Sequence, residues 1–215
     1  MTRKKTFDEQ VTLAKIGELF WRNGYVATDM TQICQAVSLN KPSIYNAYGD
    51  KAALFRKVVD WYVDDILAKG GTCLAGSAPV SEEIGALMRY FMVLPEGVVI
   101  SRGCLLATTM MELKYKEPDL FDYTQSRFDN IPRLLEGYLQ EAQESGRLRP
   151  SADPGVLSEY VFTMLLGLRV QARARSGQLN LDSLIAMAMG PLKEADKQPE
   201  GARPAPSNPR KRIQG

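Results

Sequence analysis

The sequence predicts an all-α fold. Apolar residues recur at helical spacing along nearly the whole chain, and no stretch alternates apolar and polar residues as a half-buried strand would. The chain has 215 residues, 45% hydrophobic and 24% charged, which suits one or two globular domains with ample core. It has neither a signal-like opening segment nor an apolar run of membrane-spanning length, so we expect a cytoplasmic protein with no membrane partner.

Two helices are predicted near the N-terminus. Thr6 or Asp8 can cap the first, which carries apolar residues on one face and closes at residues 23–24. Thr28 or Asp29 can cap the second, which is short.

The segment "LNKPSIYNAYGDK", residues 39–51, predicts a third helix with much polar and aromatic surface. Asn40 can cap its start, and Pro42 falls in the first turn, where a missing N–H is tolerated. Two short helices joined by a three-residue turn over residues 28–48 have the layout of a helix-turn-helix. The outer face of the second helix carries side chains suited to base edges and phosphates in a major groove, namely Lys41, Pro42, Ser43, Tyr45 and Asn46.

A larger helical body follows. A long amphipathic helix is predicted from Asp50 to about Lys69, where a loop containing Gly and Pro begins. Further helices are expected over residues 81–94, 103–115, 119–145, 153–176 and 180–192. The last two are apolar on more than one face, and because one monomer core covers one face, we expect the other to meet a second subunit. Residues 193–215 are rich in Pro, Gly and charge, and we expect a disordered tail.

Charge is segregated along the chain. Residues 1–57 hold nine Lys and Arg against five Asp and Glu, whereas residues 58–192 hold twelve against seventeen. A basic N-terminal module on an acidic body favours a polyanion as the partner of that module. Arg3, Lys4 and Lys5 form a basic arm in front of it, for which a solvated terminus is the alternative interpretation.

The sequence lacks the residues that many enzymes and metal sites use. It has no histidine, which is the commonest general base and metal ligand. It has no phosphate-binding glycine loop, no G-x-S-x-G and no carboxylate cluster at metal spacing. Cys34, Cys73 and Cys104 are scattered without a C-x-x-C pair. We therefore expect no disulfide, metal or cofactor, and no enzymatic activity.

The N-terminal quarter closely resembles the TetR family of one-component transcriptional regulators. "LFWRNGYVATDMTQICQAVSLNKPSIYNAYGDKAALF" is similar to the family pattern of LF, GY-x-AT, I-A-x-x-A-G-V and L-Y-x-x-F-x-x-K-x-x-L, with Ser38 in place of the usual turn glycine. Further on, "RGCLLATTMMEL" resembles the corresponding helix of some relatives. The resemblance implies a helix-turn-helix DNA-binding domain over residues 1–50 and a helical ligand-binding and dimerisation domain over residues 51–192. It also implies a homodimeric repressor that leaves its operator when a small, largely apolar effector binds.

The same resemblance implies which residues approach double-stranded DNA. Those expected near bases are Thr31, Lys41, Pro42, Ser43 and Asn46. Those expected near the phosphate backbone or its supporting shell are Thr28, Tyr45, Tyr48 and Lys51. For Tyr45 and Lys51, the alternative is an exposed aromatic and a solvated cation without a partner.

Several side chains of the helical body could line an effector cavity. Met and aromatic residues adapt to apolar ligands, although most such stripes are merely core. The Met and aromatic candidates are Trp61, Tyr62, Met88, Phe91, Met92, Met110, Met111, Tyr123, Phe128 and Met164. Cys104 and Thr108, which follow Gly103, are candidates as well. Arg102, Glu112 and Arg169 could anchor a polar group of the ligand, but we expect surface ion pairs for them.

Two alternative functions stay open. Cys104 follows a glycine at the start of a predicted helix, where the helix field favours a thiolate, so the same DNA-binding module could sense oxidants or electrophiles. The other interpretation of this cysteine is a small buried hydrophobe. A helical carrier or enzyme without DNA binding is the second alternative, and a mobility shift on the chain's own promoter DNA would separate it from a regulator.

Overall fold

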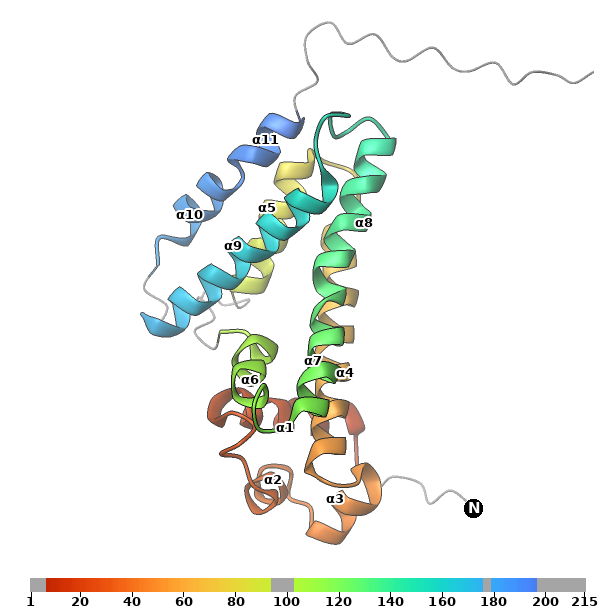
Figure 1. The fold of residues 1–215 in the computed structure, drawn as a ribbon, viewed down its shortest axis with the longest axis vertical. Helices are drawn as coiled ribbons and strands as arrows, with labels where there is room; N and C mark the ends of the chain where they lie inside the picture. The colour runs from red at the N-terminus through yellow and green to blue at the C-terminus, as the bar shows by residue number, and fades with distance from the viewer. Residues whose placement is uncertain (1–6, 94–102, 176–178, 197–215) are drawn as a thin grey trace, which may run out of the picture.

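The computed structural model describes residues 7–93, 103–175 and 179–196. These residues form eleven α-helices and no β-strand, which confirms the all-α fold (Figure 1). Within the same ranges, no helix combines the length and the apolar character needed to cross a bilayer. The predicted basic arm at residues 3–5, Arg102 and most of the predicted tail lie outside the described residues.

Three short helices form the N-terminal end: α1 (Glu9–Asn23), α2 (Met30–Val37) and α3 (Lys41–Tyr48). Asp8 caps α1, Asp29 caps α2 in a capping box with Gln32, and Asn40 caps α3. Each of these side chains accepts backbone N–H groups that the first helical turn leaves without a partner. Local sequence therefore sets where these helices start.

The fourth helix, α4 (Lys51–Cys73), is longer than predicted. The prediction ended it near Lys69 because Gly70 and Gly71 follow, and this was wrong. Gly70 is a buried helical residue, and a Cβ atom at that position would lie 2.9 Å from Leu134 Cδ2. Glycine is therefore tolerated inside the helix because it lets a neighbouring helix approach closely.

Seven further helices complete the body: α5 (Val80–Met92), α6 (Leu105–Leu113), α7 (Pro118–Phe128), α8 (Asn130–Glu144), α9 (Pro154–Ala174), α10 (Leu181–Ala188) and α11 (Gly190–Asp196). The single helix predicted over residues 119–145 is two helices, α7 and α8, which meet at Asp129. The helix predicted over residues 180–192 is likewise divided, near Met189, into α10 and α11.

The boundary predicted for the tail is also corrected. α11 continues to Asp196, so residues 193–196 are helical rather than part of a disordered tail. Ala195 is buried, and its carbonyl accepts a hydrogen bond from Arg149 N–H at 2.9 Å. Asp196 accepts a second from Ser81 N–H. These contacts with distant residues hold a segment whose composition alone does not predict a helix.

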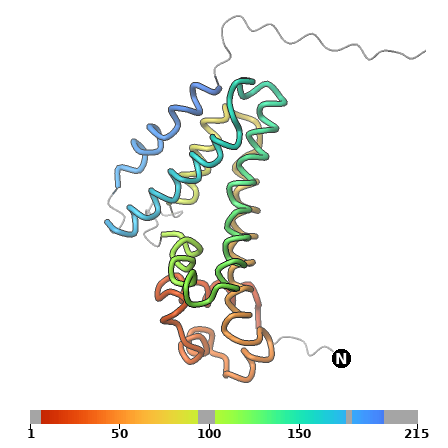
Figure 2. Tube along the Cα trace, viewed as in Figure 1, coloured from red at the N-terminus to blue at the C-terminus, as the bar shows by residue number. Residues whose placement is uncertain are grey.

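The body is elongated, with α4 and α8 running along its length and α9 packed on α8 (Figure 2). α10 and α11 pack on α5 at the end away from α1–α3. Near its start, α4 contacts the N-terminal helices through an aromatic cluster of Phe20, Tyr25 and Phe55, with ring centroids 5.0 to 5.9 Å apart. One continuous helix therefore belongs to both parts of the molecule.

Candidate nucleic-acid interface and internal cavity

α2 and α3 are joined by a three-residue turn and form a helix-turn-helix. Ser38 ends α2 in the left-handed conformation with φ +57°, and its N–H donates to the carbonyls of Cys34 and Gln35. Ile33 in α2 and Ile44 in α3 are fully buried. These apolar anchors fix how α3 sits on the core and therefore which of its side chains face outward.

The outward face of α3 carries the side chains predicted to approach bases. Lys41, Pro42 and Asn46 are exposed, and Ser43 is half-buried, with its N–H donating to the Asn40 side chain at 2.9 Å. Tyr45 is 47% exposed, which is unusual for so large a ring. The structure thus brings a cation, hydrogen-bonding groups and an aromatic ring onto one helical face, as direct readout in a major groove requires.

Two residues predicted near the phosphate backbone or its supporting shell are buried behind the surface. Thr28 is fully buried, and its hydroxyl donates to the Gly24 carbonyl at 2.7 Å. Tyr48 is buried beside the Phe7 ring, and burial, helped by Glu9, raises its pKa to about 12. Both side chains therefore support the surface from behind and are not exposed on it.

Thr31 and Lys51 flank the α3 surface. Thr31 is exposed in the first turn of α2. Lys51 is half-buried at the start of α4, with its Nζ 4.3 Å from the centroid of the Tyr25 ring. Burial lowers the pKa of Lys51, and the nearby carboxylates of Glu117, Asp29 and Glu112 oppose that shift. The cation–π contact holds the ammonium group in place at the edge of the surface.

An internal cavity of about 30 Å³ lies between α4, α5, α8 and α9. Of the predicted candidates, three line it, namely Tyr62, Phe91 and Cys104. Arg169, named above as a possible polar anchor, also lines it. The remaining lining residues were not predicted: Ile66, Gly70, Leu87, Ile131, Leu134, Leu135, Phe162, Leu165 and Leu166. Seven of these nine are aliphatic, and five of the seven lie on α8 and α9. Helical periodicity places such residues toward the core, but it does not show which of them border a space.

The other predicted cavity residues lie elsewhere. Met111 is 83% exposed on α6, and the Tyr123 hydroxyl donates to Asp60 at the contact between α7 and α4. Met88 and Met92 are fully buried in the core, and Thr108 donates its hydroxyl to the Cys104 carbonyl. None of these five lines the cavity.

Three further candidates also fall outside the lining. Phe128 packs on the cavity residue Phe162, with ring centroids 4.9 Å apart, and so forms a second layer. Met110 and Met164 are half-buried beyond the lining.

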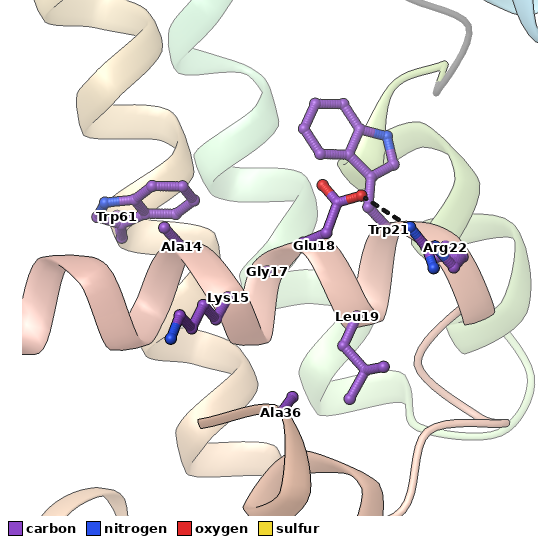
Figure 3. A pocket seen from close by; sticks show the side chains of 9 residues that line it. All are labelled: Ala14, Lys15, Gly17, Glu18, Leu19, Trp21, Arg22, Ala36 and Trp61. Carbon is purple, nitrogen blue, oxygen red and sulfur yellow. Dashed lines mark ion pairs between the residues drawn. The ribbon is translucent and has the colours of Figure 1, made fainter. Parts of the chain in front are cut away.

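Trp61, the remaining candidate, lines a different hollow. It is a groove of about 570 Å³ on the surface of the N-terminal end, between α1, α2 and α4 (Figure 3). Gly17 lies at its base, where a Cβ atom would come within 3.2 Å of the Trp61 ring. Glu18 and Arg22 form an exposed ion pair along its rim.

The polar end of the internal cavity is formed by Arg169, Tyr62 and Cys104. Arg169 was expected in a surface ion pair, but only 6% of it is exposed. Its Nε donates to the Gly103 carbonyl at 3.0 Å, and among the described residues no carboxylate pairs with it. The Tyr62 hydroxyl is buried beside Cys104, and burial raises the pKa of Tyr62, so the hydroxyl keeps its proton at neutral pH. Cys104 is itself buried at the N-cap of α6.

Two contacts join this region to the N-terminal helices. Trp21, near the end of α1, meets Tyr62 edge to face at 5.3 Å and lies 5.7 Å from the Arg169 guanidinium carbon. Glu112 was also expected in a surface ion pair, but its carboxylate accepts a hydrogen bond from Val26 N–H at 3.1 Å and lies against Gly24. α6 and α9 therefore bear directly on α1 and on the turn that precedes α2.

Comparison with known families agrees with this architecture. Residues 13–58 match the family model described as bacterial regulatory proteins, tetR family. Residues 81–187 match the model described as tetracyclin repressor-like, C-terminal domain. Together the two models account for more than two thirds of the chain.

Individual relatives are similar over nearly the whole length. The HTH-type transcriptional repressor ComR of Escherichia coli is 29% identical over 174 residues, which cover 80% of this chain and 82% of ComR. The regulator CifR, solved as a cysteine mutant with 26-bp operator DNA, has a TM-score of 0.74 at 24% identity and covers 89% of this chain and 98% of its own. The reduced form of E. coli NemR has a TM-score of 0.72 at 17% identity, over 87% of this chain and 96% of its own.

We expect Lys41→Ala to weaken binding to the promoter DNA of the chain's own gene. If Lys41 neutralises one phosphate, the magnitude of the slope of log affinity against log salt concentration should also fall by about one. If Lys41 reads a base instead, affinity for the promoter falls while the salt slope stays unchanged. Lys193→Ala, on α11 at the opposite end of the molecule, is the matched control. Fluorescence anisotropy over a salt series measures both quantities, and full affinity in Lys41→Ala would remove this residue from the interface.

Proposed function

Because this chain belongs to the TetR family of DNA-binding transcriptional regulators, we propose that it represses transcription as a homodimer and leaves its operator when a small, largely apolar effector enters the internal cavity. The observation that carries the DNA-binding part is the outward face of α3, where Lys41, Tyr45 and Asn46 stand exposed on a helix whose other face is buried. The effector part rests on the apolar lining of the cavity. A regulator of chromosomal DNA acts in the cytoplasm, which is the location we propose.

A dimer follows from the apolar side chains that the monomer leaves in solvent. Val156 and Val170 on α9 are each 62% exposed, and Met187 on α10 is 75% exposed. Leu184, also on α10, is 38% exposed. Exposed apolar residues on two adjacent helices are typical of an interface between subunits. Pairing these helices with their copies would place two α3 helices for half-sites about one DNA turn, roughly 34 Å, or a multiple of it apart.

Met187→Glu is expected to give monomers in sedimentation experiments, because two carboxylates would be buried at the paired surface. Affinity for promoter DNA should fall by roughly a hundredfold, since a monomer binds only one half-site at a time. Met111→Glu, at an equally exposed methionine on α6, is the control and should remain dimeric. Dimers that survive Met187→Glu with full DNA affinity would place the interface elsewhere.

The effector would act by shifting the population of conformations. A cavity of about 30 Å³ holds one or two waters, whereas ligand pockets commonly measure about 300 to 1,000 Å³. Binding must therefore displace lining residues, and Tyr62 and Arg169 both contact Trp21 of α1. Movement of α6 would in addition break the contact of Glu112 with Val26. Either change would shift α4, together with the helix-turn-helix packed on its start, relative to the rest of the body.

Glu112→Ala tests whether α6 holds the DNA-binding helices in place. We expect the Val26 amide to exchange faster with solvent and promoter affinity to fall about threefold to tenfold, which corresponds to the net free energy of one hydrogen bond. Glu141→Ala is the control, because Glu141 is an exposed carboxylate near the end of α8. If Glu112→Ala loses protection at Val26 but keeps its DNA affinity, α6 does not control the N-terminal helices.

A thiol switch at Cys104 is the second candidate mechanism. Cys104 lines the cavity and lies at the N-cap of α6. Among the structural neighbours, CifR was solved as a cysteine mutant and NemR in a reduced form. Against a switch in this chain, Cys104 is only 6% exposed, and a buried thiol is shielded from oxidants.

We therefore expect mild peroxide to leave DNA binding by the wild type intact, and Cys104→Ser to bind DNA like the wild type. Promoter affinity measured for both proteins, with peroxide and after reduction, checks this. Reversible release of DNA that occurs in the wild type and is lost in Cys104→Ser would establish the thiol switch in place of the simple ligand mechanism.

A further inference from the structure

We propose that the internal cavity takes a small apolar carboxylate, whose anionic head binds between Arg169 and Tyr62 and whose apolar body lies among the aliphatic residues of α8 and α9. The inference deepens the proposed function, because it rests on the effector entering this cavity. It starts from a cation that the described part of the molecule leaves without a counter-ion.

Arg169 is the centre of the site. Its side chain is more than nine-tenths buried and lines the cavity. A guanidinium has five N–H donors, and the hydrogen bond recorded for it within the described residues uses Nε alone, toward the Gly103 carbonyl. The guanidinium carbon also lies 5.7 Å from the centroid of the Trp21 ring, which accepts no conventional hydrogen bond. Burying a cation without an opposite charge is costly, so a site that keeps one is suited to an anion from outside.

The neighbouring groups select the kind of anion. The Tyr62 hydroxyl is buried and protonated. The Cys104 thiol and the Leu105 N–H lie beside it, but neither makes a hydrogen bond of normal geometry with it, so the hydroxyl can donate to an anion held by the guanidinium. A carboxylate fits a planar fork of N–H donors and accepts a further O–H bond. The rest of the lining is apolar, including Leu87, Leu134 and Phe162, which a hydrated inorganic anion would leave uncovered. A carboxylate with an aliphatic or aryl body satisfies both ends.

Calorimetric titration of the full-length protein with matched pairs, octanoate against octanol and phenylbutyrate against phenylbutanol, tests this class. We expect at least one acid to bind, and to bind more than tenfold tighter than its alcohol, as charge-assisted hydrogen bonds would give. Acetate should bind more weakly than the longer acid, because it leaves the apolar lining unfilled. Equal affinity of acid and alcohol, or no binding by either acid, would overturn the proposal.

Substitutions locate the site. Arg169→Met removes the charge and keeps an unbranched apolar side chain. It should lose more than tenfold in acid affinity while its thermal stability without ligand stays equal or rises, as replacement of buried charges by apolar groups commonly gives. Arg133→Met, at an exposed arginine on α8, is the control and should bind acids like the wild type. Unchanged acid affinity in Arg169→Met refutes the assignment. If that variant fails to fold, Tyr62→Phe is the second test, because it removes the hydroxyl and keeps the aromatic ring that packs on Trp21. Unchanged acid affinity in Tyr62→Phe would also refute the assignment.

These titrations contain no DNA, so they separate the two proposals. A chain that binds acids but keeps its promoter DNA in their presence contradicts the proposed effector mechanism and leaves the ligand class standing. If the protein binds promoter DNA but no acid, the proposal of a DNA-binding regulator stands and the proposal of a carboxylate ligand is refuted.

Discussion

The packing of Phe55 against Phe20 and Tyr25 joins the helix-turn-helix to the rest of the protein. Each aromatic side chain can bury about 150 to 250 Å² of surface, so this cluster fixes the start of α4 firmly against α1. Further along the same helix, Tyr62, Ile66 and Gly70 line the internal cavity. A helix is stiff along its axis, so the cavity and the DNA-facing surface cannot change independently, and the Trp21 and Glu112 contacts add two shorter connections between them.

The features that depend on local sequence were predictable. The caps at Asp8, Asp29 and Asn40 act within three residues of their own positions, and the outward set on α3 follows from helical periodicity once Ile44 faces the core. Ser38 shows the limit of pattern matching, because it departs from the usual glycine and still adopts the left-handed turn. The family assignment depended on these same residues, and the family models confirm it.

The features that depend on contacts between distant segments were not predictable. Gly70 ends a helix by local rules, yet it lies inside α4 because Leu134 packs against it. Arg169 meets the Gly103 carbonyl, 66 residues away, and only the fold places this cation in the interior. Thr28 was assigned by its position in the family pattern, which does not distinguish a residue exposed on the surface from one buried behind it. The cavity lining was missed for the same reason, because aliphatic residues on α8 and α9 look like ordinary core until two helices fail to fill the space between them.

The buried guanidinium of Arg169 also bears on how long the protein lasts in a cell. A cation held in the interior, with one carbonyl acceptor among the described residues, lowers the stability of the folded chain relative to an apolar residue of similar size. An anion that binds only the folded chain would raise that stability by mass action. Because proteases degrade unfolded chains, the molecule that lifts the protein from its promoter would also slow its turnover. A cell exposed to such an anion would accumulate the very regulator that the anion inactivates, and repression would return quickly once the anion is consumed.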